Sequence, residues 1–128
     1  DDQRKLARWR RIVAEAAEQS GRVPLPKVLP TKSFVEACEA PPPRTLAFLA
    51  WAAGEAMPLG RALRSLDKAT LHEVRLFVGP EGGFTPSEVV RAHHAGILAV
   101  SLGPRILRTE TAGLVALSAI LYVLGDLG

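Results

Sequence analysis

Two glycine-marked loops constrain the fold of this chain more than any other feature. Each loop follows a short run of aliphatic, partly β-branched residues. Residues 74–78 precede the loop at residues 79–84, and residues 97–100 precede the loop region at residues 101–110. Short apolar runs that end at glycine or proline are typical of buried strands. The two loops are therefore expected to follow two strands.

A helix is predicted between the two loops. Thr85 is suited to cap its start, Pro86 occupies the first helical position and Glu88 has the spacing of a capping box. Gly96 stands where a left-handed residue ends a helix. Strand, loop, helix and strand make a parallel βαβ unit, and ligands of parallel sheets bind outside the carboxyl ends of the strands. The sequence predicts an α/β fold, a parallel sheet flanked by helices, with both loops at the ligand-binding edge.

The remaining elements are predicted from periodicity and breaking residues. Residues 4–19 have the period of an amphipathic helix, and residues 31–39 are typical of a short helix. Residues 45–51 form a third buried strand candidate, and residues 61–66 are helical or turn-like. A final helix is expected from its cap at Thr109 to about Leu124.

The first helix has one apolar and one charged face. The expected core face consists of Leu6, Trp9, Ile12, Val13, Ala16 and Ala17. The opposite face carries Arg4, Arg8, Arg11, Glu15 and Glu18. Two interpretations stay open for these arginines: a solvated face with internal ion pairs, or contacts to phosphate.

The final helix is apolar on nearly every side. A helix without a polar face is buried on two sides, so we expect it to pack on its own sheet and on a second subunit. The longest apolar run, residues 112–124, is too short to cross a bilayer.

Composition narrows the class of protein. The net charge of +3 is compatible with an anionic partner but far from a general nucleic-acid-binding coat. One cysteine, Cys38, excludes an internal disulfide and a cysteine-rich zinc site, and no metal is expected. The polar start of the chain is unlike a signal peptide, so an intracellular, cytoplasmic protein is expected. The absence of an initiating Met suggests a domain from a longer polypeptide.

Familiar nucleotide motifs do not match the loops. A P-loop needs a lysine that residues 79–85 lack, and the spacing of Gly79, Gly82 and Gly83 differs from the dinucleotide fingerprint. The glycines instead favour a nucleoside-like ligand held by backbone N–H and C=O groups, because glycine permits close approach.

The amino-acid sequences of the two loops resemble those of the RsmE family of the SPOUT methyltransferases. The two motifs that carry the resemblance are Gly79-Pro80-Glu81-Gly82-Gly83-Phe84 and Ser101-Leu102-Gly103-Pro104-Arg105-Ile106-Leu107-Arg108-Thr109-Glu110-Thr111-Ala112. Residues 15–22 and 125–128 are similar to that family too, so the resemblance covers essentially the whole chain. Residues 1–128 would be its methyltransferase domain, without the PUA-like β-barrel that the family places before it.

The resemblance implies an activity and an architecture. Family members transfer a methyl group from S-adenosylmethionine to N3 of a uridine in 16S rRNA of the small ribosomal subunit. Their parallel sheet ends in a deep C-terminal trefoil knot, which general topology rules make improbable. They act as homodimers, and the apolar final helix fits such a dimer.

Site residues follow from the resemblance. The cofactor would lie against the ends of three strands, including residues 49–53. The expected cofactor-binding residues are Leu49, Gly79, Glu81, Gly82, Gly83, Ser101, Leu102, Gly103, Ile106 and Leu107.

Catalysis at a uridine N3 needs the proton removed or the developing anion stabilised. Arg105, Arg108 and Arg22 are the candidates for stabilising the anion and gripping phosphate. Glu81 and Glu110 are candidates for the base, although a glutamate such as Glu110 in a first helical turn also simply favours the helix dipole. His93 and His94, late in a surface helix, are interpreted as structural.

Two alternatives stay open at this stage. The first is a SPOUT methyltransferase for tRNA or another rRNA position, because a shared fold does not decide the substrate. The second is a non-catalytic RNA-binding or assembly module.

Overall fold

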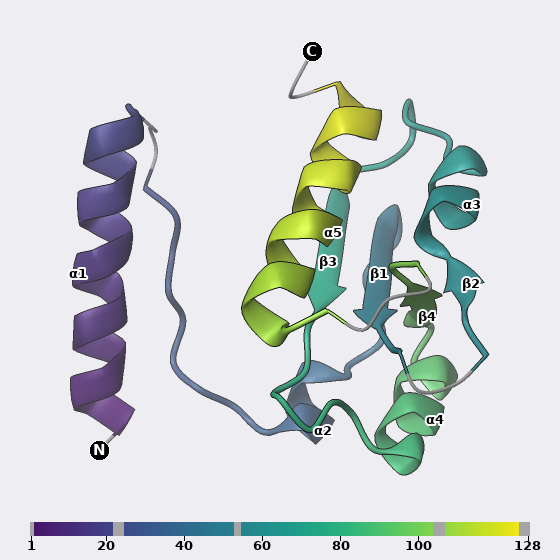
Figure 1. The fold of residues 1–128 in the computed structure, drawn as a ribbon, viewed down its shortest axis with the longest axis horizontal. Helices are drawn as coiled ribbons and strands as arrows, with labels where there is room; N and C mark the ends of the chain where they lie inside the picture. The colour runs from purple at the N-terminus through teal and green to yellow at the C-terminus, as the bar shows by residue number, and fades with distance from the viewer. Residues whose placement is uncertain (1, 22–24, 53–54, 104–106, 126–128) are drawn as a thin grey trace. The chain divides into compact units, whose positions relative to one another are not determined.

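The computed structural model describes residues 2–21, 25–52, 55–103 and 107–125 of the chain. They fall into two compact units, Asp1–Ala37 and Cys38–Gly128, which are described separately (Figure 1). The first unit contains α1 (Asp2–Ser20) and α2 (Phe34–Ala37). The second contains the sheet and helices α3 to α5.

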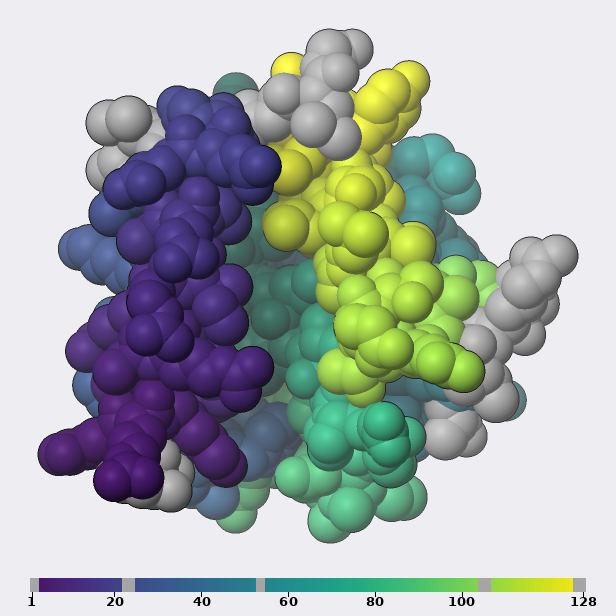
Figure 2. Space-filling view, turned by 60° about the vertical axis from the view of Figure 1, so that its left-hand side comes forward, coloured from purple at the N-terminus to yellow at the C-terminus, as the bar shows by residue number. Residues whose placement is uncertain are grey.

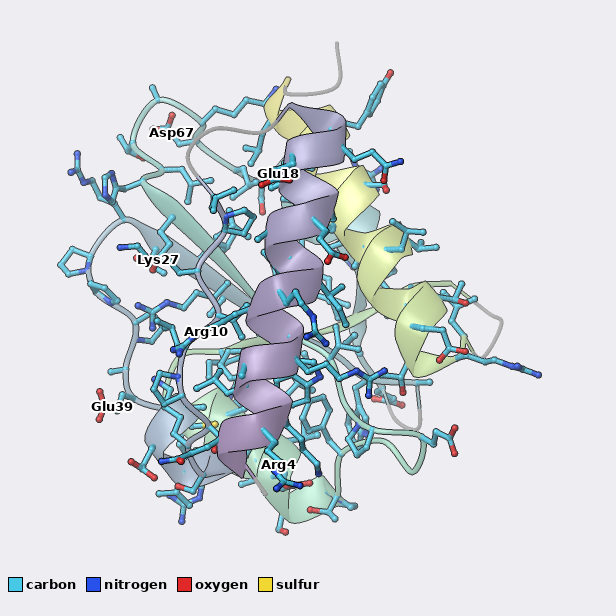
Figure 3. The ribbon with its side chains drawn as sticks, turned by 90° about the vertical axis from the view of Figure 1, so that its left-hand side faces the viewer. Arg4, Arg10, Glu18, Lys27, Glu39 and Asp67 are labelled. Atoms are coloured by element: carbon cyan, nitrogen blue, oxygen red, sulfur yellow. The ribbon has the colours of Figure 1, made fainter. Side chains whose placement is uncertain are left out.

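Helix α1 confirms the first predicted helix and extends it slightly at both ends. Gly21, with a φ of 73°, follows the helix in the left-handed conformation. The Arg10 Nε donates a hydrogen bond of 3.0 Å to the carbonyl oxygen of Val28, in the extended segment after the helix (Figure 3).

The predicted core face of α1 is partly wrong. Ala17 is buried, but Trp9 is 43% exposed and Ile12 48% exposed. Periodicity shows which residues share a helix face, and it does not show which surface covers that face.

Helix α2 is a single turn with a complete capping box. The Ser33 backbone N–H donates to the Glu36 Oε1 over 3.1 Å, and the Glu36 N–H donates to the Ser33 Oγ over 3.1 Å. The hydrogen bonds from the backbone and the hydroxyl of Ser33 hold the pKa of the Glu36 carboxyl below its ordinary value. The helix is shorter than the predicted residues 31–39.

The second unit is built on a four-stranded sheet with the order β2-β4-β1-β3. Its strands are β1 (Thr45–Ala50), β2 (Met57–Pro58), β3 (Glu73–Phe77) and β4 (Leu98–Ser101). Every pairing is parallel, which confirms the predicted α/β class and parallel sheet. The three predicted strands are confirmed with ends shifted by a residue or two.

Strand β2 was not predicted. It has two residues, Met57 opposite Val100 and Pro58 opposite Ser101. A proline is tolerated there because β2 lies at the edge of the sheet, where a missing N–H costs no ladder hydrogen bond.

The predicted helix after the first loop is confirmed as α4 (Pro86–His94). The Thr85 Oγ1 accepts from the Glu88 N–H over 3.2 Å, and the Glu88 Oε1 accepts from the Thr85 N–H over 2.8 Å. Gly96 has a φ of 89°, as expected for the residue that ends this helix.

The final helix is α5 (Thr109–Leu124), and its predicted cap is wrong by one residue. Arg108 is the N-cap, Thr109 is already helical, and the Arg108 side chain makes no capping hydrogen bond. The Arg108 carbonyl oxygen accepts from the N–H groups of Thr111 and Ala112 over 3.0 and 2.7 Å. The helix therefore begins without a cap from Thr109.

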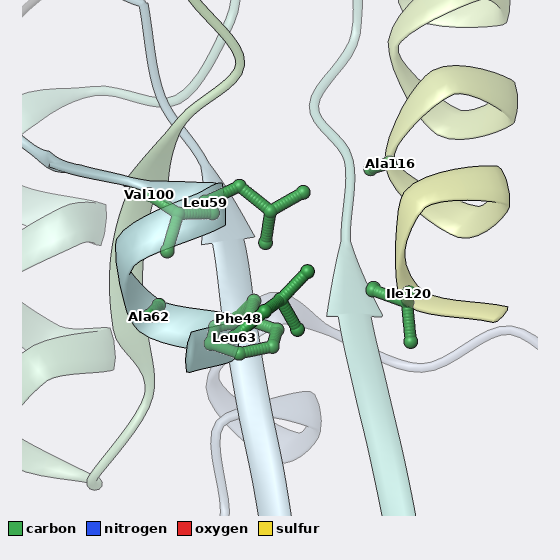
Figure 4. Packing of buried hydrophobic residues seen from close by; sticks show 7 residues of the cluster. All are labelled: Phe48, Leu59, Ala62, Leu63, Val100, Ala116 and Ile120. Carbon is green, nitrogen blue, oxygen red and sulfur yellow. The ribbon is translucent and has the colours of Figure 1, made fainter. Parts of the chain in front are cut away.

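One hydrophobic cluster joins the sheet to α3 (Leu59–Arg64) and α5 (Figure 4). It contains Phe48, Leu59, Ala62, Leu63, Val100, Ala116 and Ile120. Because side chains alternate along a strand, Ala47 and Leu49 point to the other face of the sheet, and both are buried there. Burial on both faces explains why the central strand β1 is a continuous apolar run.

Across the described ranges, none of the helices has both the length and the apolar character needed to span a membrane.

Candidate functional site

A cavity of about 520 Å³ lies at the carboxyl ends of β1, β3 and β4 in the second unit. Three strand-end segments line it: residues 50–52, residues 78–84 and residues 102–103. The segment at residues 107–110 and Ala112, at the start of α5, complete the lining. The volume falls within the range for small-molecule and cofactor sites, roughly 300–1,000 Å³.

The first glycine loop is a tight turn without room for a side chain at its base. The Gly83 N–H donates to the Pro80 carbonyl oxygen over 2.8 Å, and Gly83 has a φ of 72°. A Cβ on the buried Gly79 would lie 3.2 Å from the Gly83 carbonyl carbon and from the Phe84 ring. At Gly82, by contrast, a Cβ would meet no atom within 4 Å. This loop therefore presents backbone to the cavity.

The second glycine loop is held by a hydroxyl. The Gly103 N–H donates to the Ser101 Oγ over 3.2 Å, and the same hydroxyl donates to the Gly103 carbonyl oxygen over 3.2 Å. Gly103 has a φ of 110°, which favours glycine. Ser101 therefore shapes the loop from outside the cavity lining.

Three charged side chains border the cavity: Glu81, Arg108 and Glu110. All three are exposed, and among the described residues none of them forms an ion pair or a side-chain hydrogen bond. They are thus available to a ligand. The same cavity wall contains the first turn of α5, whose N-terminal end favours negative charge.

The structure brings together most of the predicted cofactor residues. Those that line the cavity are Gly79, Glu81, Gly82, Gly83, Leu102, Gly103 and Leu107. Leu49 is fully buried in the sheet, one residue before the lining begins at Ala50. Ile106 lies outside the described residues.

The candidate catalytic residues are only partly placed. Arg108, Glu81 and Glu110 share the cavity, whereas Arg22 and Arg105 lie outside the described residues. His93 and His94 are exposed on α4 with ring centroids 6.4 Å apart, and neither lines the cavity.

Sequence reasoning missed four lining residues: Val78, Phe84, Thr109 and Ala112. Val78 directly precedes the first glycine motif and Phe84 is its last residue, so their position beside the predicted glycines was the available signal. Thr109 and Ala112 are spaced i, i+3, which places them on one side of the first turn of α5.

Trp51 also lines the cavity, within the strand end that was predicted as residues 49–53. Its backbone N–H donates to the Val100 carbonyl oxygen over 3.0 Å and ties the end of β1 to β4. Its indole Nε1 is buried without a hydrogen-bond partner among the described residues.

No group of three or more His, Cys, Asp or Glu side chains that could hold a metal is found in the part of the chain that the structure describes. The cavity offers backbone amides, two carboxylates and one guanidinium. Such a set can hold a nucleoside-like organic ligand and can move a proton or stabilise an anion beside it.

Comparison with known proteins gives matches along nearly the whole chain. Residues 1–121 match the RNA methyltransferase domain family. The chain is 44% identical over 119 residues to the ribosomal RNA small subunit methyltransferase E of Synechocystis, covering 92% of this chain and 39% of that protein. The protein of the same name from Bacillus subtilis is 39% identical over 123 residues, covering 93% and 47% of the two chains.

A solved structure is also similar. It is the ribosomal RNA small subunit methyltransferase E of Neisseria gonorrhoeae bound to S-adenosyl methionine, with a TM-score of 0.87 and 40% identity. The match covers 99% of this chain and 51% of that chain. The chain thus spans about half the length, or less, of these relatives.

Proposed function

The chain belongs to the RNA methyltransferase domain family, and from this premise we propose that it transfers a methyl group from S-adenosylmethionine to N3 of a uridine in 16S rRNA. The resemblance to the RsmE family is confirmed by the named relatives. The observation that carries the proposal is the glycine-walled cavity at three parallel strand ends. A relative with a TM-score of 0.87 is described with this cofactor bound.

The residues at the cavity fit S-adenosylmethionine. A Cβ at Gly79 would crowd the Gly83 backbone and the Phe84 ring at 3.2 Å. Gly83 and Gly103 adopt positive φ angles that keep backbone groups at the wall. We propose that the backbone at residues 79–83 and 102–103 holds the adenosine part, with Leu102 and Leu107 providing apolar contact. When bound, S-adenosylmethionine supplies a methyl group that is already activated on a sulfonium.

The protein's share of the chemistry is orientation and proton removal. In-line approach of the uridine N3 to the methyl carbon depends on the walls that hold both molecules. Glu81 and Glu110 are the two carboxylates at the cavity that can accept the N3 proton. Arg108 is the guanidinium there that can stabilise the uridine anion. Arg105 and Arg22 remain candidates for the same role.

We propose that the active form is a homodimer that pairs through α5. Figure 2 shows α5, coloured light green to yellow, at the surface along its length. Several of its large apolar side chains are exposed. Leu114 is 68% exposed, Leu117 49% and Tyr122 68%. Such a contiguous apolar face on one helix is typical of a protein interface.

We further propose the deep trefoil knot of the RsmE resemblance, at the junction of β4 and α5. The fold supports it through the parallel order β2-β4-β1-β3 and through a cavity shared by the two glycine loops. Both units belong to the proposed methyltransferase domain, because the family match spans residues 1–121. The proposed partner is the small ribosomal subunit, and the proposed location is therefore the cytoplasm.

Transfer from tritiated S-adenosylmethionine to isolated small ribosomal subunits tests the function. The expected result is label in 16S rRNA, recovered as N3-methyluridine by nucleoside mass spectrometry. Large-subunit RNA and tRNA serve as matched substrates, and Gly82→Val serves as the protein control. Label in tRNA or at another base would replace the proposed substrate, and RNA binding without any label would identify a non-catalytic module.

A further inference from the structure

The first half of α1 is strongly basic. Residues 4–11 contain five cations and no acid: Arg4, Lys5, Arg8, Arg10 and Arg11. Asp2 begins the helix, and the acids Glu15 and Glu18 follow in its second half. Figure 3 labels Arg4 near the start of the helix and Glu18 near its end. The cations of the helix are thus concentrated in residues 4–11, between Asp2 and the two glutamates.

Three of the cations form a stripe. Arg4, Arg8 and Arg11 are spaced i, i+4 and i+7, so they lie on one face of the helix, and all three are exposed. We call these three residues the arginine stripe. Arg10 lies on a different face, and its Nε donates to the Val28 carbonyl oxygen, which ties it to the segment after the helix.

The stripe does not stabilise the helix. Arg4, in the first turn, opposes the helix macrodipole. The pairs Arg4–Arg8 and Arg8–Arg11 place like charges one turn apart, which is unfavourable. The electrostatic interactions within the helix therefore favour a different arrangement of charged residues.

Internal ion pairs do not account for the stripe either. Arg11 and Glu15 have i, i+4 spacing, yet Arg75–Glu73 in β3 is the ion pair found among the described residues. The stripe arginines likewise form no hydrogen bond there. The interpretation as a solvated face with internal pairs therefore loses its support, and three guanidinium groups remain free for an anionic partner.

We propose that the arginine stripe of α1 binds the phosphate backbone of the RNA substrate, a contact that rests on the proposed function. Arg4 and Arg11 are separated by about 10 Å along the helix axis. That distance corresponds to roughly three phosphates at their axial spacing on one strand. Guanidinium groups suit phosphate because their planar donors bind two oxygens at once. The stripe positions RNA without reading its sequence.

The test is the salt dependence of RNA binding. The variant carries Arg4→Gln, Arg8→Gln and Arg11→Gln, since glutamine keeps helix propensity. Binding of a fluorescein-labelled single-stranded RNA of mixed sequence is followed by anisotropy at several salt concentrations. Three lost phosphate contacts should lower the slope of log Kobs against log salt by about two. Affinity for S-adenosylmethionine, measured by calorimetry, should stay at the wild-type value.

The matched control removes the same charge elsewhere. Arg61, Arg64 and Lys68 are exposed in and after α3, and their triple change to Gln also lowers the net charge by three. The control should keep the wild-type slope. If both triple variants lost the same amount of slope, the effect would be one of net charge and the proposal would be overturned. An unchanged slope in the stripe variant would also overturn it. Circular dichroism of both triples confirms that α1 is still folded.

Methyl transfer separates this proposal from the proposed function. A wild-type chain that labels small subunits, together with a stripe variant that binds and labels RNA equally well, refutes the stripe and leaves the enzyme. A wild-type chain that binds S-adenosylmethionine but neither binds nor labels RNA refutes both.

Discussion

The helices that follow the two glycine loops begin in opposite ways. Helix α4 starts with a full set of local signals: Thr85 and Glu88 cap each other's backbone, and Pro86 occupies the first position. Helix α5 starts at Arg108 with no side-chain cap. The two helices have the same position in the fold, after a parallel strand and a glycine loop, so the difference is one of function and packing.

The two helices also differ in whether their first residues line the cavity. The polar side chains at the start of α4 are used on its own backbone, and neither Thr85 nor Glu88 lines the cavity. The start of α5 lines it with Arg108, Thr109 and Glu110. A helix start without a side-chain cap can offer its N–H groups and its dipole to a ligand.

The exposed faces differ as well. Helix α4 exposes Arg91, His93 and His94, whereas α5 exposes Leu114, Leu117 and Tyr122. A polar outer face is solvated by water, whereas an apolar outer face is stabilised by packing against another surface. Four substitution pairs test this contrast, from the largest expected effect to the smallest.

Glycine replacements in the two loops should have the largest effect. Gly82→Val and Gly103→Val should each weaken S-adenosylmethionine binding on the order of 100-fold, measured by calorimetry. They should differ in stability. The φ of 110° at Gly103 should make Gly103→Val cost roughly 1–3 kcal/mol, whereas a Cβ at Gly82 meets open space. Wild-type affinity in both variants would remove the cofactor assignment.

Arg108→Ala should come next, because we propose that this side chain acts on the uridine or its phosphate rather than on the cofactor. We expect about a 100-fold loss in kcat, with S-adenosylmethionine affinity within about twofold of wild type. The matched change in α4 is Arg91→Ala, an exposed arginine away from the cavity, which should leave both quantities unchanged. If kcat is retained in Arg108→Ala, the guanidinium is only solvated.

Substitution by lysine tests the exposed faces of α5 and α4. Leu117→Lys on α5 should raise the dimer dissociation constant by at least about tenfold, because a charge would be buried in an apolar interface. Val90→Lys on α4, where Val90 is 55% exposed, should leave the oligomeric state unchanged. Multi-angle light scattering over a dilution series reports both. A wild-type chain that is monomeric at tens of micromolar, roughly where a large apolar interface should hold, would refute the dimer.

The caps themselves should show the smallest effect. Thr85→Ala removes a capping hydroxyl and should lower the free energy of unfolding by about 1 kcal/mol in urea denaturation. Thr109→Ala should change it by less than about 0.5 kcal/mol, since Thr109 caps nothing. Equal losses in the two variants would show that α5 depends on its threonine after all.

Local sequence determined much of this fold. The sequence alone predicts the three strands at residues 45–51, 74–78 and 97–100, the capping box of α4 and the left-handed Gly96, and the structure contains all of them. Each rests on interactions within a few residues, such as a strand's apolar run or a hydroxyl and an N–H three positions apart. The glycines that line the cavity are predicted for the same reason, because the residues that form each turn are adjacent in the sequence.

Tertiary structure decided the rest. The edge strand β2 exists only because Met57 lies beside Val100 of β4, and α5 begins after Arg108 rather than after a cap by Thr109. The exposure of Trp9 and Ile12 on α1 depends on what covers them, which no periodicity contains. The lining of the cavity by Thr109 and Ala112 likewise needs β1, β3 and β4 to end at one edge. Contacts between residues far apart in the chain are properties of the assembled sheet, and a pattern within one segment cannot specify them.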